Sequence, residues 1–199
     1  MRFIGITGGV GAGKSEILKH LMENPRFLVR QADNIAHSLM EKGKPLFHKV
    51  VETLGEDVLS SEGEIDRKKM AEKIFKEPLL KEKINSLIHP AVKDFIREDT
   101  VKAAASGKYD IYFLEAALLI ECGYGKICEE LWYIYADENV RRERLRLNRA
   151  YSDEKIELIM KSQLPDSVFR ENCAHVIDNS GELDQSIEDI DRLISGYTG

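Results

Sequence analysis

The chain has 199 residues, of which 43% are hydrophobic and 32% are charged, as in globular enzymes and unlike disordered chains. Its formal net charge of -6 gives no general attraction to nucleic acid or to an anionic membrane, so anionic substrates require local positive charge. No apolar run approaches the roughly 20 residues of a membrane span, and the three cysteines lack C-x-x-C spacing. We therefore expect a cytoplasmic protein that binds neither nucleic acid nor membrane.

The first part of the chain alternates short apolar runs with helical patterns. Residues 3–7 predict a buried strand, and a helix with apolar residues at helical spacing should begin near Lys14. Residues 27–29 predict a second strand that runs toward Asp33. Asp33 can also cap a helix that continues through Met40.

Residues 45–105 are predicted to be helical. Pro45 can begin one helix of this segment, and Asp66 is a plausible N-cap for another. The His89-Pro90 pair is expected to break the segment into two further helices, because proline removes a backbone donor.

Strands and helices alternate again after residue 105, which implies an α/β fold with a parallel sheet covered on both faces. Ligands of such sheets bind beyond the carboxyl ends of the strands, where Thr7, Asp33 and Glu115 are predicted to lie. The predicted strands are residues 110–114, 131–135 and 175–177, and the predicted helices are residues 138–148, a segment after Ser152 and residues 182–195.

Residues 8–15 match the pattern G-x-x-x-x-G-K-S/T between a predicted strand and a predicted helix. The glycines let the backbone curl, so that its N–H groups and the helix N-terminus form an anion cradle. Lys14 is expected to reach the β- and γ-phosphates of ATP, and the Ser15 hydroxyl is expected to hold Mg²⁺. A glycine-rich turn without a ligand is the alternative. We interpret the motif as the ATP site of a P-loop kinase.

Two carboxylates at strand ends are candidates for the chemistry. Asp33 can accept the proton of an acceptor hydroxyl and help to position it; its alternative role is the helix cap. Glu115 can orient magnesium-bound water, or be a half-buried carboxylate satisfied by a neighbouring helix.

Five arginines occur within nine residues, and Arg142, Arg146 and Arg149 share one helical face. Guanidinium groups bind phosphate oxygens in bidentate fashion and stabilise charge on a transferring group. A helical lid that carries them can close over ATP and exclude water. The alternative is a solvated face paired with Glu138 and Glu143.

In this order, several blocks resemble the dephospho-CoA kinase family over nearly the whole chain. The first block is residues 5–15, and the last two are residues 162–165 and 174–181. Between them lie Ala32-Asp33, Ile35-Ala36, Gly43, Pro45, Gly63, Asp66-Arg67, Ile74-Phe75, His89-Pro90, Leu118-Leu119 and Glu121.

The resemblance implies that ATP and 3′-dephospho-CoA react to give ADP and CoA, the last step of coenzyme A biosynthesis, with the ribose 3′-hydroxyl as acceptor. It implies a P-loop NTPase three-layer sandwich with a five-stranded parallel sheet, as one domain over residues 1–199. A helical CoA-binding insertion would occupy about 45–105 and a small helical lid about 138–163.

The resemblance also assigns site residues. The catalytic residues would be Asp33 as the base and Lys14, Arg144 and Arg149 as the groups that stabilise the transferring phosphoryl group. Dephospho-CoA would border Thr7, Asp33, His89, Leu118 and Leu119. ATP would contact Gly9, Val10, Gly11, Ala12, Gly13, Lys14, Ser15, Glu16, Asn179 and Gly181, with Ser15 also on the metal.

Some positions depart from the family pattern. Gln31 and Ala117 replace an expected aspartate and proline, and Glu16 replaces a threonine after Ser15. Asn148 stands where the lid arginine is expected, so a neighbouring arginine has to supply it.

The runner-up function is a nucleoside or nucleoside-monophosphate kinase, and a regulatory P-loop NTPase or an inactive binding module are further alternatives. The regulatory reading is weakened by the absence of an N-K-x-D motif for GTP. The sequence leaves the oligomeric state open, and a monomer is plausible.

Overall fold

The computed structural model describes residues 1–197, and its contacts divide the chain into two compact units. The first unit contains Met1–Arg30 and the chain from Lys102 onward, and the second contains Gln31–Val101. The predicted insertion of about 45–105 falls largely within the second unit. Its assignment to CoA binding stays a prediction.

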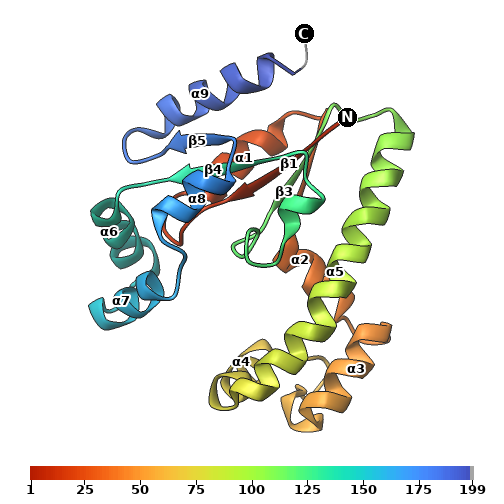
Figure 1. The fold of residues 1–199 in the computed structure, drawn as a ribbon. Coiled ribbons are helices and arrows are strands. Elements are labelled where there is room, and N and C mark those ends of the chain that lie inside the picture. The colour runs from red at the N-terminus through yellow and green to blue at the C-terminus, as the bar shows by residue number, and fades with distance from the viewer. Residues whose placement is uncertain (198–199) are drawn as a thin grey trace. The chain divides into compact units, whose positions relative to one another are not determined.

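A five-stranded sheet forms the centre of the first unit, with the strand order β2-β3-β1-β4-β5 (Figure 1). The pairs β1–β3, β1–β4 and β4–β5 are parallel, as expected where helices connect the strands. The predicted α/β class with a five-stranded parallel sheet is confirmed. The strands are β1 (Arg2–Thr7), β2 (Phe27–Gln31), β3 (Ile111–Glu115), β4 (Glu130–Tyr135) and β5 (His175–Asp178).

Side chains alternate between the two faces of this sheet. On one face, Ile6 and Ile134 lie in a core with the apolar residues of α1 (Lys14–Glu23) and α9 (Leu183–Ser195). On the other face, the ring of Tyr133 stacks on Phe169 of α8 (Asp166–Asn172), with 4.6 Å between the centroids. The helices therefore hold both faces of the sheet and leave the strand ends for the site.

Two helices of the first unit correspond to the predicted lid. They are α6 (Glu138–Arg149) and α7 (Asp153–Lys161), which contact each other. The hydroxyl of Ser152 accepts a hydrogen bond from Lys155 N at 3.3 Å, so the predicted N-terminus of α7 is confirmed.

The second unit consists mainly of helices around a small apolar core that includes Val50, Leu54 and Ile84. The side chain of Asp66 accepts hydrogen bonds from two backbone N–H groups and caps α4, as predicted. The helices are α2 (Ala32–Leu39), α3 (Pro45–Leu54), α4 (Arg67–Lys76) and α5 (Pro78–Ser106), of which α5 ends in the first unit.

The expected break at His89-Pro90 is wrong, because α5 continues through Pro90 as one helix of 29 residues. Proline in a helix interior costs about 3 kcal/mol, which is why the sequence predicts an end there. Ile84, Val92 and Ile96 are buried on both sides of the proline, and their packing offsets the lost hydrogen bond. Within residues 1–197, no helix is both long and apolar enough to cross a membrane.

Candidate functional site

The phosphate-binding loop of residues 8–15 connects β1 to α1, in the structural context that the motif requires. Three of its glycines have positive φ angles, 150° at Gly8, 86° at Gly11 and 89° at Gly13, where L side chains are strained. A Cβ at Gly13 would also overlap the side-chain amide of Asn179. Glycine is needed here both for the curl of the backbone and for the close approach of its neighbours.

Polar side chains lie at both ends of this loop. Lys14 Nζ donates hydrogen bonds to the carbonyl oxygens of Gly8 and Gly9 at 2.7 and 3.3 Å. Thr7 ends β1 fully buried, and its Oγ1 has no hydrogen-bond partner within residues 1–197, a costly state that a ligand or water relieves. The Ser15 hydroxyl is on an exposed residue and open to a metal ion. The curled backbone, the lysine and the unpaired hydroxyl fit the phosphate chain of a nucleotide.

Asn179, which follows β5, connects the loop to the C-terminal part of the chain. Its side chain is 2% exposed, and Nδ2 donates to the carbonyl oxygen of Ala12 at 2.7 Å. The Ser186 hydroxyl can donate to the Asp178 carbonyl at 2.9 Å or to Asn179 Oδ1 at 3.0 Å, and Arg144 Nη1 donates to the Asn179 carbonyl at 2.8 Å. The Asn179 side chain is thus used inside the protein, while Gly181 has open space around it. Adenine binding by this turn stays a proposal.

Removal of this buried amide tests its role. We expect Asn179→Ala to lower the free energy of unfolding by about 1–3 kcal/mol, because the Ala12 carbonyl loses a buried donor, while the Ser186 hydroxyl keeps the Asp178 carbonyl as its acceptor. Thermal unfolding measures the change. The control is Asn172→Ala, which removes an exposed bond to the Val168 carbonyl. Equal unfolding temperatures for the two variants would contradict a stabilising role of the buried Asn179 amide.

The arginines of α6 lie in different surroundings. Arg142 forms ion pairs with two glutamates at 2.7 and 2.6 Å, and Arg146 pairs with an aspartate at 2.6 Å. These two arginines therefore form the solvated, paired face that was the alternative to a phosphate role. Arg144 reaches the Asn179 carbonyl beside the loop, whereas Arg149, at the end of the helix, is exposed.

Asp33 lies in the first turn of α2, in the second unit. The alternative role of Asp33 as the cap of this helix is wrong, because Gln31 occupies the N-cap position and makes no side-chain cap. The helix begins earlier because Ala32 is already helical and buried. The exposed Asp33 carboxylate is therefore not used for capping and is open to a ligand.

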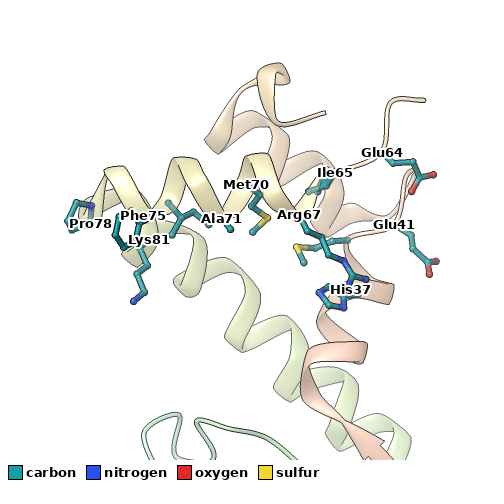
Figure 2. Close-up of a pocket in the computed structure, with 12 residues that line it drawn as sticks. His37, Glu41, Glu64, Ile65, Arg67, Met70, Ala71, Phe75, Pro78 and Lys81 are labelled. Atoms are coloured by element: carbon teal, nitrogen blue, oxygen red, sulfur yellow. The ribbon is translucent and has the colours of Figure 1, made fainter. Parts of the chain in front are cut away.

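His37, one helical turn after Asp33, borders a cavity of about 860 Å³ within the second unit (Figure 2). The lining is largely apolar between α2, α4 and the start of α5, with Met40, Met70 and Phe75 among its residues. Phe75 is 89% exposed, an unusual state for a large aromatic ring. The cavity can hold a ligand with an extended apolar part.

Charged groups are distributed unevenly around this cavity. Figure 2 shows Arg67 beside His37 at one end and Lys81 near Phe75 at the other. Burial lowers the pKa of His37, Arg67 lowers it further and Asp33 opposes both. The imidazole is therefore neutral at pH 7, and Arg67 and Lys81 supply positive charge at the two ends. Glu41 and Glu64 also line the cavity at the Arg67 end, so an anionic group of a ligand would have to lie against Arg67 or Lys81 and away from these two carboxylates.

The remaining predicted substrate residues differ in how deeply they are buried. His89 is inside α5 and half-buried, and burial lowers its pKa. Leu118 is 50% exposed, whereas Leu119 is fully buried and would contact a Cβ placed at Gly5. The side chain of Leu119 therefore belongs to the core. Glu115 ends β3 opposite Ile6 of β1, at the edge where the loop begins.

Comparisons with known proteins agree with this geometry. The family model described as dephospho-CoA kinase matches residues 2–185. A dephospho-CoA kinase of Aquifex aeolicus (strain VF5) is 33% identical over 198 residues, which cover 100% of this chain and 98% of that protein.

Two solved structures show the same fold. A dephospho-CoA kinase from Campylobacter jejuni has a TM-score of 0.72 at 21% identity, with 98% of this chain and 96% of that chain covered. A shikimate kinase from Acinetobacter baumannii has a TM-score of 0.52 at 14% identity, with 100% and 96% covered. The likeness to both supports a P-loop kinase fold.

Proposed function

We propose that this chain, which belongs to the dephospho-CoA kinase family, transfers the γ-phosphoryl group of ATP to the ribose 3′-hydroxyl of 3′-dephospho-CoA. The observation that carries the ATP part is the complete phosphate-binding loop, with Lys14 held against the carbonyls of Gly8 and Gly9. The loop does not identify the acceptor, because kinases with different acceptors share it. The assignment of the acceptor rests on membership of the family.

The transfer forms a bond from the 3′-oxygen to the γ-phosphorus and breaks the bond from that phosphorus to the β–γ bridging oxygen. Asp33 takes the proton of the 3′-hydroxyl as the new bond forms. The loop N–H groups and Lys14 stabilise the charge on the phosphate oxygens and on the departing ADP. Thr7, at the start of the loop, can donate its unpaired hydroxyl to a substrate oxygen.

Mg²⁺ supplies charge neutralisation across the β- and γ-phosphates when bound, and the exposed Ser15 hydroxyl would hold it. The turn at residues 179–181 would border the adenine, through its backbone because the Asn179 side chain is engaged inside the protein. We propose that the enzyme acts in the cytoplasm on small-molecule substrates and binds no nucleic acid.

The cavity of the second unit is proposed to hold the phosphopantetheine arm of the acceptor. The four residues from Asp33 to His37 rise about 6 Å along α2, so a nucleotide whose 3′-hydroxyl lies at Asp33 can place its 5′-diphosphate near His37. His37 is one turn after Asp33 on α2, with Arg67 beside it. The apolar residues Met40 and Met70 line the space beyond and suit the uncharged part of the arm.

An acceptor panel tests the function. Purified protein, ATP and Mg²⁺ are mixed separately with dephospho-CoA, adenosine, AMP, CMP and shikimate, and ADP release is followed. We expect ADP with dephospho-CoA alone, and CoA as the product by mass spectrometry. Turnover of AMP or CMP instead would move the protein to the nucleotide kinases, and turnover of none would support an inactive binding module.

Substitution of Arg67 tests whether the acceptor binds in this cavity. We expect Arg67→Gln to raise KM for dephospho-CoA by about 10- to 100-fold, because a hydrogen bond to a charged group is worth about 1.5–3 kcal/mol. KM for ATP should not change. The control is Lys68→Gln, on the next residue of α4 and outside the cavity lining. An equal rise for both substrates, or no rise for either, would contradict this placement of the acceptor.

A further inference from the structure

Arg141 extends from the first turn of α6 to the phosphate-binding loop. Its Nε donates to the carbonyl oxygen of Val10 at 3.0 Å, and its Nη2 donates to Gln163 Oε1. The guanidinium covers Gly9 so closely that a Cβ there would overlap it. Arg141 therefore occupies the space directly over the loop, and Gln163 fixes its orientation.

The protein does not neutralise the charge of Arg141. Both of its acceptors are neutral, and no carboxylate within residues 1–197 forms an ion pair with it. Glu138, one turn earlier on the same helix, pairs with Arg142 instead. Burial lowers the pKa of Arg141, and the nearby Tyr133 and Glu138 oppose this effect only in part. A partly buried cation with neutral partners is stabilised when an anion binds beside it.

The position of Lys14 indicates which part of a bound phosphate chain Arg141 would contact. The Lys14 ammonium lies 3.3 Å from the Gly9 carbonyl oxygen, and the Arg141 guanidinium covers the same glycine. Two positive charges thus converge on Gly9 from two elements. Because the lysine of this motif reaches the β- and γ-phosphates, the arginine lies at the same end of the phosphate chain.

We propose that Arg141 binds the β- and γ-phosphates of ATP and stabilises the charge of the transferring group. Arg141 then acts as a catalytic arginine of the lid. Arg144 reaches the other end of the loop, where it donates to the Asn179 carbonyl and would lie 3.5 Å from a Cβ at Gly13, whereas Arg149 is exposed at the far end of α6. The inference rests on the proposed use of ATP and not on the identity of the acceptor.

The test compares the affinities of the protein for ATP and ADP by titration calorimetry in the presence of Mg²⁺. In Arg141→Gln, we expect ATP affinity to fall about tenfold or more, and to fall further than ADP affinity, because ADP lacks the γ-phosphate. We expect kcat to fall by about 10²- to 10³-fold and Arg141→Lys to be intermediate. Arg192→Gln, on exposed Arg192 of α9, should behave as wild type.

The ratio of the two affinity losses distinguishes a contact with the γ-phosphate from a structural role. A structural role would lower the affinities for ATP and ADP equally. Equal losses, or no loss, would overturn the proposal. Thermal unfolding of the unliganded variants shows whether the fold is retained, and Arg141→Lys keeps the comparison possible if Arg141→Gln does not fold. Because neither titration contains an acceptor, the result stands even if the proposed acceptor is wrong.

Discussion

Replacement of Asp33 by asparagine is expected to lower kcat by about 10²- to 10⁴-fold, the usual contribution of a general base. Asparagine has nearly the same shape but cannot take the proton of the 3′-hydroxyl. The structure favours a clean test, because Asp33 is exposed and makes no helix cap, so the variant should fold normally. Steady-state kinetics with dephospho-CoA measure the loss, and calorimetry should show unchanged ATP affinity.

The matched control for this experiment is Asp94→Asn. Asp94 is also an exposed aspartate of the second unit, and it pairs with Arg97 three residues later on α5. Such a surface pair contributes little, so we expect kcat within about twofold of wild type. If Asp33→Asn also retained kcat within that range, another group would have to accept the proton.

The strands and the phosphate-binding loop could be predicted from the sequence because their signals are local. Each strand is a short apolar run beside glycine or polar residues, and the loop has a fixed spacing of glycines before Lys14. Local signals were misleading at Pro90, where burial of Ile84 and Val92 holds α5 together. The seven-residue helix α8 was not predicted, since a helix with Phe169 as its buried residue has no apolar periodicity.

The contacts that complete the site join residues far apart in the chain. The bond from Asn179 to Ala12 spans 167 residues, and the bond from Arg141 to Val10 spans 131. No spacing rule distinguishes Arg141 from Arg142 on a helix with five arginines, because their roles depend on which side faces the loop. The motif fixes glycine at positions 8 and 13 and leaves position 9 free, so the close approach of Arg141 is what requires a glycine at position 9.

Replacement of Lys14 by methionine is the second change with a large expected effect. We expect kcat to fall by about 10³-fold and ATP affinity to fall as well, because the loop loses the charge that reaches the β- and γ-phosphates. Methionine keeps a similar unbranched stem but leaves the Gly8 and Gly9 carbonyls without this donor. Lys19→Met, on an exposed lysine of α1 paired with Glu16, is the control.

Lys14 and Arg141 can then be tested together, because both are placed beside Gly9. If both stabilise the same phosphate oxygens, the double variant Lys14→Met with Arg141→Gln should lose less activity than the product of the two single losses. Additive losses would mean that the two cations act on separate groups. In that case Lys14 would keep its role at the β- and γ-phosphates, and Arg141 would serve to hold the Val10 side of the loop in place.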